Sequence, residues 1–362
     1  MWGVTSHTSR RMPRAARSAA SVIVGAVVAG SALAAGLAGC SSPPSPTPTP
    51  TPTEAAWVSD YVAPEPQVLS PLRGTSVAPG SVVGPALSAK VDNHDGARPQ
   101  IGLGRADIVF EELVEGGITR YVAIWQSDVP ELLGPVRSIR PMDPDIITPF
   151  GGIVAYSGGQ EQFVEMMMAT PVVNAVFDYD DTDIFYRVDG YESPHDVVVK
   201  AIELVARNAD LAPPAQQFAY AATPAAASAV VDGTGVSAIN TRFSDERWPS
   251  WSWDAAGQLY LRSQEGSPDQ DSDGVQLAAT NVVVMRVGID WSYGEVPKTV
   301  MLGSGEAWVS SGGKTIHGTW AKDAATSPIR LVDDSGVVIR LAEGNTWVEL
   351  VPSDQGSVEL VP

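Results

Sequence analysis

Residues 107–125 read DIVFEELVEGGITRYVAIW and carry the strongest structural signal in the chain. Two runs rich in β-branched and aromatic residues, 107–111 and 118–125, flank the pair Gly116-Gly117. Runs of this composition favour strands, and two glycines between them favour a tight turn. The stretch therefore predicts a β-hairpin.

Further elements are predicted on both sides of this hairpin. Residues 87–91 and 151–156 are short apolar runs typical of buried strands. Residues 161–168 and 197–209 have helical spacing, and the second segment places Ile202, Val205 and Ala206 on one side. Mixed strands and helices predict an α/β arrangement for this half of the chain.

The pattern changes after residues 211–230, which are rich in Ala and Pro and lack periodicity. We place a domain boundary there. Beyond it, short apolar runs alternate with Gly, Asp and Ser, at 281–285, 298–302, 307–309 and 347–351. The predicted fold class is α+β, with a mixed α/β domain over residues 70–215 and a smaller, mainly β domain over residues 216–362.

Length and composition agree with a folded, acidic protein. The chain has 362 residues, 44% of them hydrophobic and 18% charged, which suffices for two ordinary domains. Lys and Arg number 23 against 42 Asp and Glu, a net charge of −19. This balance argues against a nucleic-acid partner, because such binders carry a basic surface. The single cysteine excludes an intramolecular disulfide.

Residues 1–39 are typical of a secretory signal, because a leader with four arginines precedes an uncharged stretch over residues 19–39. Leu37-Ala38-Gly39-Cys40 resembles the bacterial lipobox. The resemblance implies that residues 1–39 are removed and that Cys40 carries a diacylglycerol. The alternative is an uncleaved transmembrane anchor, and both interpretations place the rest of the chain outside the cytoplasm.

Removal of the leader makes the chain more acidic. It takes away four basic residues and no acid, which leaves 19 basic against 42 acidic residues, a balance of −23. Residues 41–56 then hold six prolines that alternate with Ser and Thr, a composition that favours extended polyproline II. We therefore expect residues 40–69 to be a lipidated cysteine and a Pro/Thr-rich spacer that holds the folded part away from the membrane.

Arginine is concentrated in residues 90–140. Guanidinium groups suit bidentate contacts to phosphate or carboxylate, and Arg137 and Arg140 lie on a loop bounded by Gly and Pro. The alternative is that these arginines brace loops by pairing with acids of the same window, such as Asp92 and Glu111. The hypothesis is one cleft for an anionic ligand, lined by Arg98, Arg120, Arg137, Arg140 and His195, with Asn93 as a further candidate.

Acid–base chemistry is the second hypothesis for the same segment. His195 precedes Asp196 where we expect a helix to start, and a histidine beside carboxylates is able to act as a general base. Asp92 and Glu115 are the candidate carboxylates, and Asp92 is expected to approach His94 and His195. The alternative is a capping or hydrogen-bonding histidine. The sequence holds no H-E-x-x-H, C-x-x-C or G-x-S-x-G motif that would strengthen the catalytic interpretation.

Two weaker signals lie in the C-terminal half. Asp269, Asp271 and Asp273, followed by Gly274, match the first half of a calcium loop, but the twelfth position is Thr280 and not Glu. Calcium is therefore a weak possibility beside a solvated acidic hairpin loop, and no other cofactor is predicted. Seven tryptophans lie between residues 248 and 347. They are able to stack on sugars, but half-buried core positions are the more common role.

Several spaced motifs together resemble the YerB-like lipoprotein family, a two-domain bacterial family of unknown function. The resemblance covers roughly residues 85–351 and implies an envelope lipoprotein, without implying an activity. In the N-terminal half it rests on residues 90–94, 97–100, 115–120, 134–141 and 193–196. In the C-terminal half it rests on residues 251–254, 281–284, 303–305, 318–322 and 344–348.

These observations favour a non-catalytic binding or accessory lipoprotein of a Gram-positive-type envelope. It would be anchored to the cell membrane through Cys40, on the extracytoplasmic face. Its expected partner is an anionic envelope polymer or an envelope protein. The alternative is an envelope hydrolase or transferase acting on a phosphorylated or glycan polymer, with His195, Asp92 and Glu115 as catalytic residues.

Overall fold

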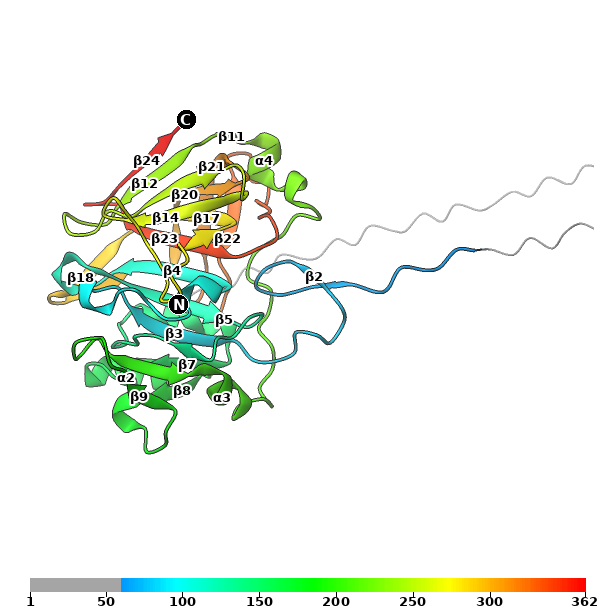
Figure 1. Cartoon of the computed structure of the whole chain (residues 1–362). Coiled ribbons are helices and arrows are strands. Elements are labelled where there is room, and N and C mark those ends of the chain that lie inside the picture. Colours follow the sequence, from blue (N-terminus) through cyan, green and yellow to red (C-terminus); the bar gives the residue numbers. More distant parts are fainter. Residues whose placement is uncertain (1–59) are drawn as a thin grey trace, which may run out of the picture. The chain divides into compact units, whose positions relative to one another are not determined.

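A mixed sheet of eleven strands runs through both halves of the chain (Figure 1). The computed structural model describes residues 60–362, and residues 63–362 belong to one compact unit. The leader, Cys40 and most of the predicted spacer lie outside the described residues. In sheet order the strands are β11 (Thr234–Gly235), β21 (Lys314–Lys322), β20 (Gly303–Ser311), β17 (Asn281–Val287), β23 (Thr346–Pro352), β4 (Ile108–Leu113), β5 (Thr119–Trp125), β3 (Leu87–Asp92), β7 (Ile153–Tyr156) and β8 (Val173–Val176), with β22 (Arg330–Asp333) on β21.

The predicted hairpin is confirmed and lies near the middle of this sheet. Strands β4 and β5 pair antiparallel from Ile108 opposite Ile124 to Leu113 opposite Thr119. Gly116 and Gly117 both have φ near +75°, a conformation that favours glycine. On its two sides the hairpin pairs with β3, which is antiparallel to β5, and with β23, which is parallel to β4. The β4–β23 ladder joins the two halves of the chain.

The remaining elements pack around the large sheet. A six-stranded sheet comprises β15 (Ser267–Pro268), β14 (Leu259–Gln264), β13 (Ser250–Asp254), β12 (Ala238–Arg242), β24 (Ser357–Val361) and β16 (Ala278–Ala279). A three-stranded sheet comprises β6 (Leu132–Leu133), β10 (Val197–Lys200) and β9 (Phe185–Arg187). Two hairpins are β1–β2 (Val68–Leu69, Ser76–Val77) and β18–β19 (Ile289–Tyr293, Val296–Thr299). The α-helices are α1 (Asp143–Ile147), α2 (Glu161–Met168), α3 (Ala201–Ala206) and α4 (Ser228–Asp232).

These elements confirm the α+β class, with one local correction. Helix α2 spans the predicted residues 161–168, and strands β17, β20 and β23 cover the predicted runs 281–285, 307–309 and 347–351. The run predicted over 298–302 is strand only at its start, because β19 ends at Thr299. The helix predicted over 197–209 is wrong in its first turn, because Val197–Lys200 forms β10 and only Ala201–Ala206 is helical. Three consecutive valines favour a strand, and pairing with β6 and β9 decides the outcome. Within residues 60–362, none of the helices is both long and apolar enough to cross a bilayer.

Alternate side chains of the central strands enter two separate cores. Phe110 and Val122 face one core, which α1 and α2 cover, and Val109 and Tyr121 face the other, which the six-stranded sheet covers. Successive strand residues point to opposite faces, so a strand buried on both sides is apolar almost throughout. Of the seven tryptophans between residues 248 and 347, Trp251, Trp320 and Trp347 are buried in the core as expected, whereas Trp248 and Trp291 are each 47% exposed.

A fully buried arginine links the large sheet to the six-stranded sheet. Arg262 of β14 forms ion pairs with Glu111 of β4 and with Asp269. Its guanidinium carbon lies 5.5, 5.8 and 5.0 Å from the ring centres of Tyr121, Trp251 and Trp347. Burial opposes the charged form, but the neighbouring carboxylates raise the pKa of Arg262 above its usual range. The charge is therefore retained in the core through its partners.

Replacement of Arg262 tests this linkage. In Arg262→Met, Glu111 and Asp269 lose their cation inside the core, and an uncompensated buried charge costs about 3–5 kcal/mol. We expect the free energy of unfolding, measured by urea titration with tryptophan fluorescence, to fall by that amount. Arg105→Ala is the matched control, because Arg105 and its partner Asp128 are exposed and such pairs contribute about 0–1 kcal/mol. Equal stabilities of the two variants would contradict the role of Arg262.

Candidate functional site

Charged side chains gather where β3 and β5 lie opposite each other at Asp92 and Arg120. Both residues are buried, Asp92 as the last residue of β3 and Arg120 as the second residue of β5. We use the name Asp92 cluster for six residues that lie on, or at the end of, the sheet face covered by α1. They are Asp92, Glu115, Arg120, Arg137, Arg140 and His195.

Asp92 and His195 form a short contact in this cluster. The Nδ1 atom of His195 lies 2.6 Å from Oδ2 of Asp92, whose side chain is fully buried. A carboxylate only accepts hydrogen bonds, so Nδ1 donates and Nε2 of the neutral ring keeps a free lone pair. Within residues 60–362, Nε2 of His195 has no hydrogen-bond partner, and the side chain is 14% exposed. The geometry is that of an oriented histidine with one nitrogen available to a ligand or a proton.

A second histidine stacks on the first. The rings of His94 and His195 are 4.2 Å apart and nearly parallel, with an interplanar angle of 8°. The backbone N–H of His94 donates to Oδ1 of Asp92 at 3.1 Å, and its Nδ1 atom accepts from the N–H of Gly96 at 3.0 Å. His94, and not His195, is thus the helix-capping histidine, at the start of the short 3₁₀ helix Asp95–Ala97. His195 lies in a loop before β10, so the expected helix start at this residue is wrong.

Arg137 approaches the same carboxylate oxygen as His195. Its Nε atom lies 3.1 Å from Oδ2 of Asp92, and one terminal nitrogen lies 3.4 Å from the carbonyl oxygen of Pro194. The backbone is held in place as well, because the N–H of Arg137 donates to the carbonyl of Lys90 at 2.8 Å. The Arg137 side chain remains 21% exposed. Arg137 and His195 therefore lie together at the surface, above a buried acid.

Arg140 and Arg120 share a different acid. Nε of Arg140 donates to Oε2 of Glu115 at 2.8 Å, its second nitrogen pairs with Oε1, and a nitrogen of Arg120 lies 3.5 Å from Oε1. Burial alone would raise the pKa of Glu115, but the hydrogen bonds from Arg140 and the two positive charges lower it to about 2. Burial, together with the charge of Arg140, lowers the pKa of Arg120 to about 10.

A second layer of charges lies beneath the Asp92 cluster. Lys90 of β3 is fully buried and pairs with Asp143 at 2.8 Å and with Glu112. Burial lowers the pKa of Lys90 to about 8, against the charge of Asp143, which raises it. Asp143 also accepts from the backbone N–H of Arg140 at 2.6 Å, so the two layers are connected. The charges of the lower layer are paired with one another and buried, whereas Arg137 and His195 lie closer to the surface.

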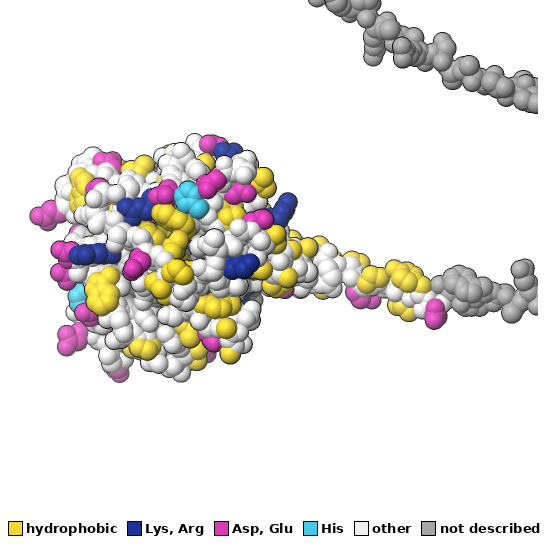
Figure 2. Space-filling view, turned by 90° about the horizontal axis from the view of Figure 1, so that it is seen from above, with side chains coloured by type: hydrophobic (Ala, Val, Ile, Leu, Met, Phe, Trp, Pro, Cys, Tyr) yellow, Lys and Arg dark blue, Asp and Glu magenta, His cyan; other side chains and the backbone are white. Residues whose placement is uncertain are grey.

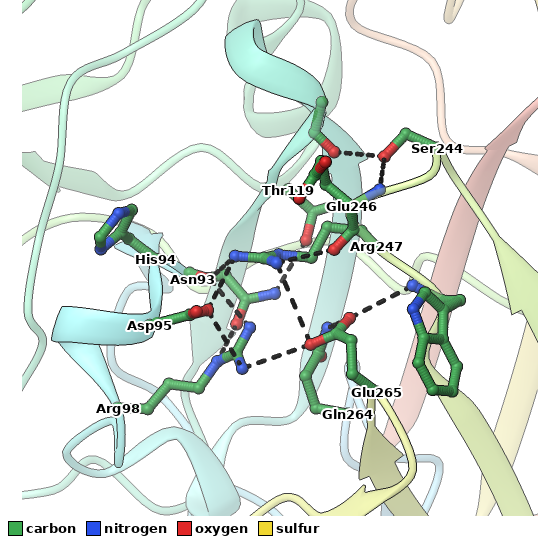
Figure 3. A network of polar contacts seen from close by, with 12 residues as sticks. Asn93, His94, Asp95, Arg98, Thr119, Ser244, Glu246, Arg247, Gln264 and Glu265 are labelled. Atoms are coloured by element: carbon green, nitrogen blue, oxygen red, sulfur yellow. Dashed lines mark hydrogen bonds and ion pairs between the residues drawn. The ribbon is translucent and has the colours of Figure 1, made fainter.

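Asn93 and Arg98 belong to a separate network (Figure 3). Asn93 contacts Glu111, the partner of Arg262, so this network lies on the face of the large sheet that the six-stranded sheet covers. The Asn93 amide donates to Thr119 at 2.8 Å, and its oxygen accepts from Nε of Arg98 at 3.0 Å. Arg98 also lies 3.4 Å from Glu265, and Arg247 lies 3.0 Å from Asp95 and 3.3 Å from the carbonyl of Asn93. The five residues predicted to line one cleft are thus divided between two faces.

Arg247 and Glu265 are members of this network that sequence analysis missed. They follow Asn93 and Arg98 by more than 150 residues, and they lie in the C-terminal half. No local motif marks either of them, because their partners come from another sheet. Only covariation between distant positions is a signal able to find such pairs from sequence.

The acidic loop uses its three carboxylates separately. Asp269 pairs with the buried Arg262, and Asp271 accepts from the N–H groups of Gly102 and Gly104 at 2.9 and 2.7 Å. Asp273 accepts from the N–H of Val275 at 2.9 Å. Among residues 60–362, no group of three or more His, Cys, Asp or Glu side chains is placed to hold a metal ion. Calcium binding stays a prediction, which thermal unfolding with and without millimolar calcium tests.

Five cavities among residues 60–362 have lining residues outside the centre of the Asp92 cluster. Neither Asp92, Arg137 nor His195 lines any of these five. Arg140 is engaged through two nitrogens with Glu115. The part of the cluster able to meet a ligand is therefore the partly exposed pair Arg137 and His195, on an open surface.

The pKa of Glu115 predicts how stability depends on pH. Because the folded-state value, about 2, lies below the ordinary 4.5, the ionised carboxylate stabilises the fold above about pH 4.5. This stabilisation is lost as the pH falls from there toward 2. We expect Glu115→Gln to lower the free energy of unfolding by about 1–3 kcal/mol at pH 7, near the lower end since Glu115 is partly exposed.

Urea titrations at pH 7, 5 and 3 measure this effect. The difference between wild type and Glu115→Gln should shrink toward pH 3. Asp183→Asn is the control, because Asp183 pairs with Lys200 and Arg207 at the exposed surface and should change stability little. A loss that is the same at all three pH values would contradict the ionic role of Glu115.

Comparison with known proteins identifies the family. Residues 74–213 match the N-terminal domain of the "Protein of unknown function (DUF3048)" family, and residues 239–348 match its C-terminal domain. "Putative lipoprotein YerB" of Bacillus subtilis is 27% identical over 290 residues, which cover 74% of this chain and 81% of the relative. The crystal structure of YerB from B. subtilis superposes with a TM-score of 0.70 at 23% identity, covering 81% of this chain and 99% of that one. The chain belongs to the DUF3048, or YerB-like, family.

Proposed function

We propose that this chain is a lipid-anchored binding protein of the bacterial cell envelope, which captures an anionic group at Arg137 and His195. The single observation that carries the proposal is that both side chains meet the buried Asp92 while remaining partly exposed. Arg120 is the next cation of the cluster, although it is almost fully buried. The expected partner is an anionic envelope polymer or an envelope protein, and no nucleic acid.

Local charge supports an anionic ligand. The Asp92 cluster holds three guanidinium groups against two carboxylates, before any protonation of His195. This excess is local, because the chain as a whole has a net charge of −19. On the face shown in Figure 2, basic side chains are scattered singly among acidic and hydrophobic ones. An anion would be recognised by the guanidinium of Arg137, which Asp92 already orients, and by the Nε2–H group of His195 in the protonated form of its ring, with Nδ1 still donating to Asp92. Donors that are oriented before binding lower its entropic cost.

The membrane anchor in this proposal rests on two independent supports. Leu37-Ala38-Gly39-Cys40 resembles a lipobox, and the B. subtilis relative is named a lipoprotein. Lipid on Cys40 would place the folded part on the extracytoplasmic face of the cell membrane. The proline-rich residues 41–56 would separate the folded part from the membrane.

A second candidate function is hydrolysis or transfer on a phosphorylated or glycan polymer. The hydrogen bond between Asp92 and His195 favours it, because a carboxylate that orients a histidine is a common general-base arrangement. His195 would take a proton from water or a hydroxyl through Nε2, and Asp92 would hold the ring. Glu115 is less suited to proton transfer, because Arg140 binds both of its oxygens and keeps its pKa near 2.

Binding of inorganic phosphate and glycerol 1-phosphate, measured by calorimetry, tests the first candidate. We expect Arg137→Ala and His195→Ala to weaken binding about tenfold each, since one charge-assisted hydrogen bond contributes about 1.5–3 kcal/mol. Arg207→Ala is the control, because Arg207 is exposed and paired with Glu203 and Asp183 elsewhere on the surface. Unchanged affinity in Arg137→Ala and His195→Ala would remove this site from the proposal.

The same variants distinguish the two candidates. If the chain turns over a chromogenic phosphodiester, His195→Ala should abolish turnover, whereas a binding protein shows a graded loss of affinity and no turnover in the wild type.

Substitution of Cys40 tests the anchor. Cys40→Ser removes the thiol that would carry the lipid, so the protein should move from the membrane fraction to the soluble or secreted fraction of the expressing cells. Cell fractionation followed by immunoblotting measures how the protein is distributed between these fractions. Retention of Cys40→Ser in the membrane fraction would favour an uncleaved transmembrane anchor instead.

A further inference from the structure

Trp248 projects from the surface between two buried residues. Arg247 and Pro249 on either side are buried, whereas Trp248 is 47% exposed. Its backbone N–H donates to Oε1 of Glu265 at 3.2 Å, which fixes the position of the residue. Its indole N–H has no acceptor within residues 60–362, unlike the indole N–H groups of Trp251 and Trp320. The ring is thus a rigidly mounted aromatic surface with a free donor.

A polar groove of about 340 Å³ adjoins this ring. It lies over β12 and its two neighbours in the six-stranded sheet, β13 and the edge strand β24. The Asn240 amide donates to Oε2 of Glu359 at 3.0 Å, so these two side chains are held in a defined arrangement. The lining residues are Asn240, Thr241, Arg242, Trp248, Pro249, Ser250, Ser357 and Glu359.

The chemistry of this groove matches a sugar. A pyranose ring has a face of C–H groups, which packs against an aromatic ring, and an edge of hydroxyls, which both donate and accept hydrogen bonds. Trp248 offers the aromatic face, and an amide, hydroxyls, a carboxylate and a guanidinium surround it. A membrane surface or an apolar peptide would leave these polar groups desolvated without partners, which is unfavourable.

We propose that the Trp248 groove is a glycan-binding subsite. Trp248 stacks on a sugar ring, and Asn240 and Glu359 bind its hydroxyls. The site shares no residue with the Asp92 cluster and goes beyond the proposed anion binding, so each stands without the other. We expect the ligand to be an oligosaccharide chain. The groove is open to solvent, so the chain is able to continue beyond the one sugar ring that stacks on Trp248.

Oligosaccharide binding by the full chain tests the proposal. The protein is purified in a detergent without a sugar head group, so that the detergent does not compete. It is applied to an array of neutral and acidic glycans, and the affinity for chitotetraose and for the strongest array ligand is measured by calorimetry. We expect saturable binding, quenching of tryptophan fluorescence, and at least a tenfold loss of affinity in Trp248→Ala, with a smaller loss in Asn240→Ala.

Trp291→Ala is the matched control. Trp291 lies on β18, is also 47% exposed, and lines none of the five cavities. The Trp291→Ala variant should bind the glycan as the wild type does. Trp248→Ala and Trp291→Ala should both keep the wild-type melting temperature, since both rings are half exposed. Absence of binding to every glycan of the array, or equal affinity of Trp248→Ala and wild type, would overturn the proposal. An equal loss in the two variants would overturn it as well, because the effect would then be unspecific.

Discussion

The buried guanidinium of Arg262 is the interaction on which the joining of the two halves depends. It comes from β14 and meets Glu111 of β4, beneath the rings of Tyr121, Trp251 and Trp347. A charge in such a position requires its partners, and the partners require it, because either alone would be desolvated without compensation. The N- and C-terminal halves must therefore fold against each other to satisfy it. The parallel pairing of β4 with β23 imposes the same requirement through backbone hydrogen bonds.

The same constraint explains why the candidate site lies at one end of the central strands. At the end of β3 and the start of β5, adjacent residues carry charged side chains to one face of the sheet and neutral polar side chains to the other. Asp92 and Arg120 point to one face, and Asn93 and Thr119 point to the other. Each face completes its network with residues from loops, His195 on the first and Arg247 on the second. The arginine-rich segment is thus mainly a set of paired charges. Within the Asp92 cluster, Arg137 and His195 are the nitrogen-bearing side chains that are held in place and are also more than a tenth exposed.

Sequence analysis predicted the fold well where the signals were local. The hairpin around Gly116-Gly117, helix Glu161–Met168 and strands β17, β20 and β23 follow from residue spacing and turn chemistry. It failed at Val197–Lys200, where the apolar spacing fits a helix but β-branched residues and two neighbouring strands produce β10. For the site, Asp92 and His195 were correctly expected to approach each other, whereas Arg98 was placed with the wrong partners. The side to which each arginine turns depends on strand register, which no local pattern encodes.

The amino-acid sequence by itself determined the α+β class, the family, and the lipobox-like segment at Cys40, because each depends on neighbouring residues or on motifs in order along the chain. Tertiary structure decided which charges meet. His195 reaches Asp92 across 103 residues, and Arg262 reaches Glu111 across 151. The physical reason is that an ion pair or an oriented histidine depends on burial and on exact distance. Strand pairing and the packing of sheets set both of these, and they act between residues that are far apart in the sequence.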